Sequence, residues 1–129
     1  MTRYLLDTTA LIDFSKGREP AQSRILAMIN EGSEVGVCAI NLTEFYAGIM
    51  PERPDVWQDF FASLEYYVIS RSAAIKAGAL RYMLGRQGQQ ISTTDALIAA
   101  VALEQHAVRV TDNSKHYPID NLHLASVRN

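Results

Sequence analysis

The sequence predicts an α/β layered fold with a mostly parallel sheet of four or five strands. Short apolar runs alternate along the chain with longer segments whose apolar residues recur at helical spacing. Alternation of this kind is typical of strand–helix–strand units, in which neighbouring strands are parallel. The 129 residues are 48% apolar, which suits one hydrophobic core, and no repeat or linker divides them. We therefore expect a single domain over residues 1–129.

The N-terminal part of the chain predicts two strands, each followed by helical sequence. The first strand ends at Asp7, and Thr8 and Thr9 are placed to cap the helix after it, which stops near Gly17. In order, the expected elements are a strand over 3–7, a helix over 10–14, a helix between Pro20 and Gly32, a strand over 35–40 and a helix that starts at Asn41.

The rest of the chain continues the same alternation. Pro51 and Pro54 interrupt it, but they are too close together to separate two domains. The helix that Ser92 opens is apolar almost all round, so it should be central. In order, the expected elements are a helix over 56–64, a strand over 65–70, a helix over 71–86 with a loop around 85–90, a helix over 92–103, a strand over 106–111 and a fifth strand within 122–127.

The composition excludes several classes of protein. A net charge of −2 gives no global sign of nucleic-acid affinity, so any RNA-binding surface has to be local. Cys38 is the only cysteine and lies in an apolar run, which predicts a buried reduced thiol and excludes a cysteine-cluster zinc site. We expect no membrane span, because no apolar stretch approaches the roughly 18 residues required, and no signal peptide. The expected location is the cytoplasm.

Four acidic residues carry the functional prediction: Asp7, Glu44, Asp95 and Asp112. Each stands where a strand or loop gives way to a helix or turn. Ligands of parallel sheets bind outside the carboxyl ends of the strands, so all four acids can share one edge. Two carboxylates about 4 Å apart repel by roughly 4 kcal/mol at an effective dielectric near 20, so such a pocket needs a cation. Because all four are oxygen donors, we expect Mg²⁺ or Mn²⁺.

Each acid also has a purely structural explanation. An acid near a helix N-terminus gains about 0.3–1 kcal/mol from the helix dipole. The structural explanations are a helix cap for Asp7, a capping box with Asn41 for Glu44, the first turn after Ser92 for Asp95 and a turn before Asn113 for Asp112. They explain each residue singly, but they do not explain why all four fall on the same expected side of the sheet.

An acidic pocket with a divalent ion predicts metal-assisted hydrolysis of a phosphodiester, since such a site can activate water and balance charge on the attacked phosphate. The acids would be ligands first, and one of them could also take the proton of the water. The neighbours that can orient ligands or water are Thr8, Ser92, Thr94, Thr111 and Asn113, with capping at least as good an explanation for Ser92 and Thr94. The basic residues expected beside the edge are Lys16, Arg18 and Lys115.

Four segments resemble the motifs of the PIN-domain ribonucleases, in particular the VapC-type toxins of toxin–antitoxin pairs. They occur in family order and at family-like spacing, from the first strand nearly to the C-terminus. The segments are Tyr4-Leu5-Leu6-Asp7-Thr8, Asn41-Leu42-Thr43-Glu44, Thr94-Asp95-Ala96-Leu97-Ile98-Ala99-Ala100 and Val108-Arg109-Val110-Thr111-Asp112-Asn113. The last acid of the family often stands two residues after the threonine, where this chain has Asn113, so either Asp112 or Asn113 could face the metal.

The resemblance implies a three-layer α/β/α sandwich and Mg²⁺- or Mn²⁺-dependent endoribonuclease activity at Asp7, Glu44, Asp95 and Asp112. It also implies inhibition by a small cognate antitoxin protein and, commonly, a homodimer. The alternative is a catalytically silent PIN-like module that binds RNA or a protein. A Rossmann-like nucleotide binder is disfavoured, because the chain has no Gly-x-Gly-x-x-Gly sequence and no Walker loop.

Overall fold

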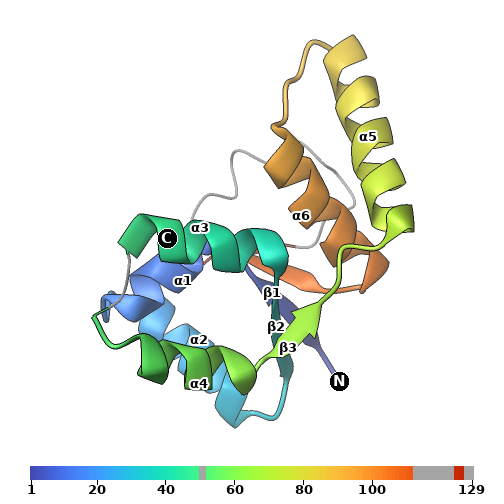
Figure 1. Cartoon of the computed structure of the whole chain (residues 1–129). Helices are drawn as coiled ribbons and strands as arrows, with labels where there is room; N and C mark the ends of the chain where they lie inside the picture. Colours follow the sequence, from blue (N-terminus) through green and yellow to red (C-terminus); the bar gives the residue numbers. More distant parts are fainter. Residues whose placement is uncertain (50–51, 112–123, 127–129) are drawn as a thin grey trace.

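A computed structural model describes residues 1–49, 52–111 and 124–126 and contains a five-stranded sheet with helices on both faces (Figure 1). All strand pairs are parallel, in the order β3-β2-β1-β4-β5. The strands are β1 (Arg3–Leu6), β2 (Glu34–Cys38), β3 (Glu65–Tyr67), β4 (Val108–Thr111) and β5 (Leu124–Ser126). The helices are α1 (Thr8–Ser15), α2 (Ala21–Asn30), α3 (Ala39–Ile49), α4 (Pro54–Ala62), α5 (Arg71–Arg86) and α6 (Thr93–Glu104). The expected α/β fold, with a parallel sheet of four or five strands, is confirmed.

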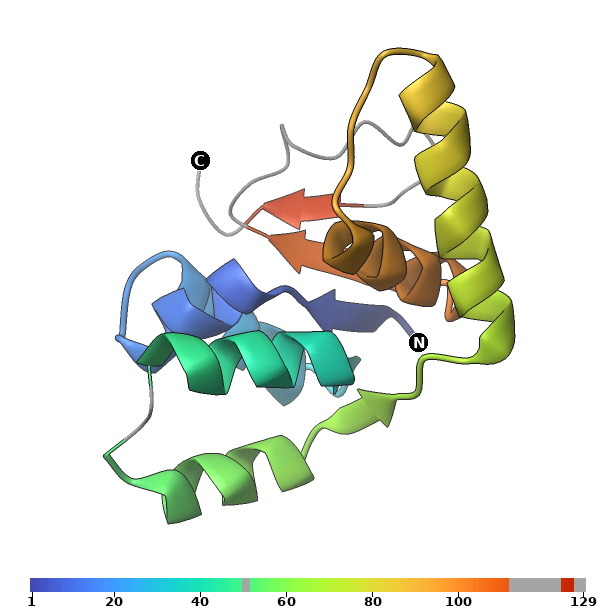
Figure 2. The ribbon, with the colours of Figure 1, turned by 45° about the horizontal axis from the view of Figure 1, so that its top comes forward.

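Alternate residues of β1 separate the two halves of the core. Leu5 points to the face covered by α5 and α6, and Leu6 points to the face covered by α1, α2 and α3. Figure 2 shows α5 and α6 packed side by side, apart from the other helices. Two layers of helices therefore enclose the sheet, which confirms the three-layer arrangement.

Several expected boundaries are wrong by a few residues, for local reasons. The strand expected over 35–40 ends at Cys38, because the buried side chain of Asn41 accepts a hydrogen bond from the Cys38 N–H at 3.1 Å and α3 begins at Ala39. The strand expected over 65–70 has only three residues, since Ser70 is already the N-cap of α5. Asp7, rather than Thr8 or Thr9, caps α1.

Helix α6 is central, as its apolar sequence predicts. Six of its twelve residues are buried between α5 and the sheet. It begins with Ser92, whose Oγ accepts a hydrogen bond from the Asp95 N–H at 3.1 Å. This cap fixes the first turn of α6, and with it Asp95, beside the carboxyl ends of the central strands.

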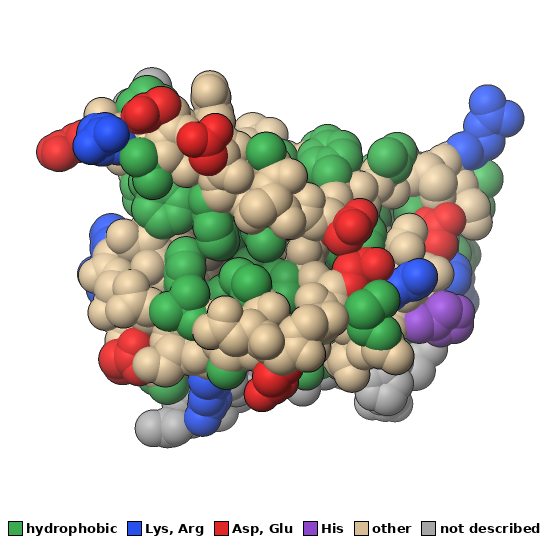
Figure 3. All heavy atoms as spheres, turned by 90° about the horizontal axis from the view of Figure 1, so that it is seen from below, with side chains coloured by type: hydrophobic (Ala, Val, Ile, Leu, Met, Phe, Trp, Pro, Cys, Tyr) green, Lys and Arg blue, Asp and Glu red, His purple; other side chains and the backbone are tan. Residues whose placement is uncertain are grey.

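The aromatic residues of α4 extend the core on the opposite face. The ring centroids of Trp57 and Phe45 lie 5.4 Å apart, and those of Phe60 and Phe14 lie 5.1 Å apart. No residue of α4 is fully buried, and Figure 3 shows apolar side chains gathered in a hollow on one face of the molecule. These rings pack against one another and against the core on this face of the sheet.

Candidate active site

Asp7 lies immediately after β1, at the carboxyl end of the sheet, and is 4% exposed. Its backbone N–H donates to Val110 O at 2.8 Å, which extends the pairing of β1 with β4. One carboxylate oxygen, Oδ1, accepts from the N–H of Thr8 at 2.8 Å, so Asp7 does cap α1. The other, Oδ2, accepts from Nη2 of Arg109 at 3.1 Å. The capping explanation is therefore right, and the same carboxylate also belongs to a charged cluster.

Asp95 reaches the same cluster from α6. Its Oδ1 lies 3.6 Å from Nη2 of Arg109, the nitrogen that also contacts Asp7. The Asp95 side chain is 41% exposed, so this carboxylate faces both the cluster and solvent. Two acids that are far apart in the sequence thus meet around one guanidinium nitrogen.

Glu44 is connected to Asp7 through Thr8. The Thr8 hydroxyl donates to Glu44 Oε1 at 2.7 Å, while the Thr8 N–H donates to Asp7. Asn41 does not form a capping box with Glu44. Its side-chain oxygen accepts a hydrogen bond from the Cys38 N–H instead. The exposed Glu44 side chain on α3 is therefore directed toward Thr8 at the start of α1, next in the chain to Asp7.

Arg109 is the site residue that was not predicted from the sequence. It is in the middle of β4, next to Leu5 of β1 in register, and its side chain is fully buried. A buried arginine needs an anionic partner, because burying an unpaired charge is very unfavourable. An arginine flanked by valines in an expected strand was the available signal, since burial of its charge required a carboxylate nearby.

Two further residues border the cluster. Cys38 is free and buried, as predicted. Burial raises the pKa of its thiol, while hydrogen bonds from the backbone at Asn41 and Ile40, and then the charge of Arg109, oppose that rise. Thr111 ends β4 and is also fully buried. Asp112, Asn113 and Lys115 lie outside the described residues.

The remaining polar candidates have mainly structural contacts. Ser92 caps α6, and its hydroxyl lies 3.2 Å from that of Thr94. Arg18 follows the C-terminal end of α1, whereas Asp7 precedes its start, and Arg18 forms an ion pair with the buried Asp13 at 3.3 Å. Lys16 is exposed just after α1.

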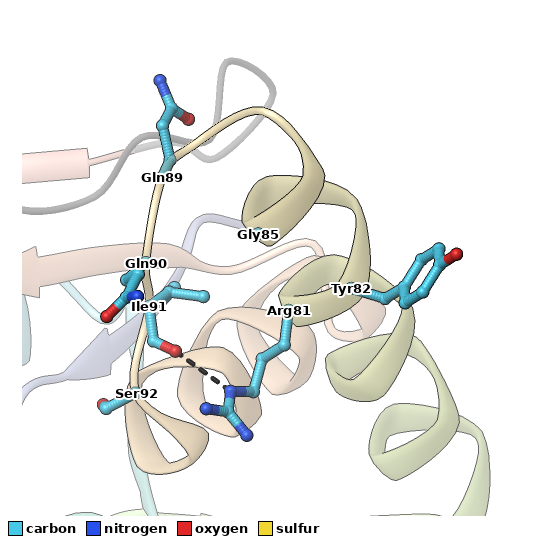
Figure 4. A pocket seen from close by; sticks show the side chains of 7 residues that line it. All are labelled: Arg81, Tyr82, Gly85, Gln89, Gln90, Ile91 and Ser92. Atoms are coloured by element: carbon cyan, nitrogen blue, oxygen red, sulfur yellow. Dashed lines mark hydrogen bonds between the residues drawn. The ribbon is translucent and has the colours of Figure 1, made fainter.

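A hollow of about 510 Å³ lies between α5 and the segment that leads into α6 (Figure 4). Its lining includes Tyr82, Gln90 and Ser92, and Nε of Arg81 donates to Ile91 O at 3.0 Å across it. Because Ser92 also caps α6, this polar hollow borders the first turn that carries Asp95.

The donor atoms of the cluster suit a hard cation. Asp7, Asp95 and Glu44 offer only carboxylate oxygens, which Mg²⁺ and Mn²⁺ prefer. The guanidinium of Arg109 demonstrates that a positive group fits between Asp7 and Asp95. Over residues 1–49 and 52–111, however, no three His, Cys, Asp or Glu side chains stand close enough to hold a metal ion between them. A metal would therefore need a movement of Glu44 or a ligand from elsewhere in the chain.

Comparison with known proteins places this chain in a family. The family profile of the PIN domain matches residues 4–122. The chain is 32% identical over 118 residues to "Ribonuclease VapC19" of Mycobacterium tuberculosis, and the alignment covers 89% of this chain and 92% of that protein. It is 29% identical over 122 residues to "tRNA(fMet)-specific endonuclease VapC" of Shigella flexneri, covering 91% of each. The solved DNA-bound VapBC from Salmonella typhimurium has a TM-score of 0.81 and 26% identity, covering 98% of both chains.

The chain belongs to the PIN-domain family, and the resemblance drawn from its four motifs is confirmed. None of the helices formed by the described residues is long and apolar enough to cross a membrane.

Proposed function

We propose that this chain is a metal-dependent endoribonuclease of the VapC type, a toxin that a cognate antitoxin neutralises. The proposal rests on one observation: Asp7 and Asp95 meet around the buried guanidinium of Arg109. Glu44 is connected to Asp7 through Thr8. The ribonuclease names of the Mycobacterium and Shigella relatives support the reaction. The VapBC assembly from Salmonella supports an antitoxin as partner.

In this proposal Asp7, Glu44, Asp95 and Asp112 hold Mg²⁺ or Mn²⁺. A bound divalent ion would supply activation of water and compensation of charge on the attacked phosphate. The Thr8 N–H and hydroxyl fix the carboxylates of Asp7 and Glu44, so Thr8 orients two of the ligands. Thr111 and Asn113 have the same orienting role in the proposal, and one of the carboxylates acts as general base toward the water.

The setting of the reaction is also part of the proposal. The substrate is RNA, the location is the cytoplasm and the active form is a homodimer. Light scattering of the purified chain with and without its antitoxin tests the dimer, and the antitoxin is expected to abolish cleavage.

The test of the activity uses two variants that leave the buried arginine in place. Glu44→Gln and Asp95→Asn remove one carboxylate charge each from side chains that are exposed or partly exposed. We expect RNA cleavage in Mn²⁺ to fall at least about 100-fold in each, because each acid is assigned to the metal. Glu31→Gln is the matched control, since Glu31 is an exposed acid at the end of α2. Cleavage at the unmodified rate by both site variants would overturn the proposal.

A second candidate function is a catalytically silent PIN-like module that binds RNA or a protein. The absence of a cluster of three ligands among the described side chains favours it. This alternative is correct if the chain, freed of antitoxin, binds RNA in Mn²⁺ but does not cleave it.

A further inference from the structure

We infer that Arg109 is a built-in counter-ion of the acidic site: it neutralises Asp7 and Asp95 in the metal-free protein, and a divalent ion that binds these acids competes with its charge. The inference rests on the proposed function, because it concerns the same carboxylates. It assigns Arg109 as a positioning residue that sets how tightly the site binds metal and how stable the fold is without metal.

The ion pair between Arg109 and Asp7 is almost completely buried. The Arg109 side chain is fully buried and the Asp7 side chain is 6% exposed, at a distance of 3.1 Å. Water cannot screen either group effectively, so each charge needs an oppositely charged group close to it. A metal-free site with this arginine is therefore already neutralised in part.

The positive charge of Arg109 lies between the two carboxylates. A single nitrogen, Nη2, faces Oδ2 of Asp7 and Oδ1 of Asp95. A divalent ion held by both carboxylates would have to occupy the space between the same oxygen atoms. The guanidinium and the ion are thus alternatives at close range, and their like charges repel at short distance in a region of low dielectric.

Arg109 occupies a position in β4 that an apolar residue could fill. It comes from β4, and its side chain points to the face covered by α6, where its register partner Leu5 joins an apolar cluster. An apolar residue would satisfy the packing at this position, and the guanidinium is directed at two carboxylates instead. The arginine at this position therefore compensates the negative charge of Asp7 and Asp95.

The test compares the full chain with its Arg109→Met and Arg109→Lys variants, freed of metal with EDTA and then titrated with Mn²⁺. Methionine keeps an unbranched apolar side chain without charge, and lysine keeps the charge without the planar fork. Arg3→Met is the matched control, since Arg3 pairs with Glu34 at the opposite end of β1. Melting temperature and Mn²⁺ affinity, from the paramagnetic resonance of free Mn²⁺, are the two measurements.

We expect Arg109→Met to melt roughly 10 °C lower than the unmodified chain in EDTA and to recover most of that loss in Mn²⁺. Its Mn²⁺ affinity should rise at least about tenfold, whereas Arg109→Lys and Arg3→Met should stay within about threefold of the unmodified chain. A residue with a purely structural role would lower the melting temperature equally with and without Mn²⁺ and would not raise the affinity.

Unchanged or weaker Mn²⁺ binding by Arg109→Met, with the unmodified chain binding Mn²⁺ normally, overturns the inference and leaves the proposed function standing. Absence of Mn²⁺ binding by all four proteins overturns both. Should Arg109→Met fail to fold in either condition, side-chain NMR of arginine-labelled unmodified chain decides. The Arg109 Nε resonance is then expected to shift with Mg²⁺ over the same concentrations as the Thr8 amide, and a stationary Arg109 signal counts against the inference.

Discussion

The two ends of the sheet carry the same kind of contact in very different surroundings. At the amino end, Arg3 of β1 pairs with Glu34 of β2, and at the carboxyl end Arg109 of β4 pairs with Asp7 after β1. Both ion pairs have a nitrogen–oxygen distance of 3.1 Å. The side chains of the first pair are 44% and 19% exposed, whereas those of the second are 0% and 6% exposed.

Burial, and not distance, determines what each pair contributes to stability. An exposed pair in water and salt contributes about 0–1 kcal/mol. Breaking a buried pair by removal of one partner costs about 3–5 kcal/mol, because a charge is left in a medium of low dielectric. The amino end can therefore tolerate change, while the carboxyl end couples stability to the candidate active site.

The largest expected effect comes from breaking the buried pair at its acid. Asp7→Ala removes the nearest carboxylate of Arg109 and the N-cap of α1. We expect the free energy of unfolding in EDTA to fall by about 3–5 kcal/mol, measured by urea denaturation. A loss below about 1 kcal/mol would show that the carboxyl end behaves like an exposed pair, contrary to the comparison.

The next effect tests the packing that supports the amino end. Gly36 of β2 lies against Tyr67 of β3, and an added Cβ would be 2.6 Å from Cε2 of that ring and 2.9 Å from the Glu65 backbone oxygen. The backbone oxygen cannot easily move, so we expect Gly36→Ala to cost about 2–3 kcal/mol in urea denaturation. Gly78→Ala is the control, because nothing lies within 4 Å of its added Cβ in the middle of α5, and a gain of about 0.5–1 kcal/mol is expected there. Equal stability of the two variants would contradict the close approach of β2 and β3.

Gly36 and Arg109 also show which features of the fold and the site the sequence alone does not predict. Asp7 and Asp95 were predictable because each follows a local signal, the end of an apolar strand and the start of an apolar helix. The five strands were predictable for the same reason, although Cys38 and Ser70 ended two of them early through hydrogen bonds within their own segments. The role of Gly36 depends on Glu65 and Tyr67 of a neighbouring strand, so no local pattern indicates it. The valines around Arg109 indicated that a carboxylate lay nearby, but its partners Asp7 and Asp95 come from other elements, so the sequence did not identify them.

A third prediction concerns the hydrogen bond that supports the exposed pair. The buried Tyr67 hydroxyl donates to Oε2 of Glu34 at 2.7 Å, and this is the carboxylate oxygen that Arg3 contacts. We expect Tyr67→Phe to cost about 1.5 kcal/mol at pH 7, since the acceptor is charged and the hydroxyl is largely removed from water. Urea denaturation of the two proteins measures the difference.

The pH dependence of this contribution follows from the phenol. Burial first, and then the hydrogen bond to Glu34, raise the pKa of Tyr67 above its ordinary value near 10. The folded state therefore holds the proton more tightly than the unfolded chain, so the contribution is fully present below about pH 10 and is lost as the pH rises toward the folded-state pKa. A difference between Tyr67→Phe and the unmodified chain that grows above pH 10 would contradict this assignment.

The smallest effect is expected at the exposed arginine itself. Arg3 pairs with Glu34, and its Nη1 also donates to the Gln105 backbone oxygen at 3.2 Å, but nearly half of its side chain remains in contact with solvent. We expect Arg3→Met to change the free energy of unfolding by less than about 1 kcal/mol in low salt, and by less still in 1 M NaCl, where the Debye length is about 3 Å. Glu34 keeps its Tyr67 hydroxyl and its access to water, so the lost cation leaves no buried charge behind. A loss as large as that of Asp7→Ala, and insensitive to salt, would mean that distance alone determines the strength of both pairs, and the contrast between the two ends of the sheet would fail.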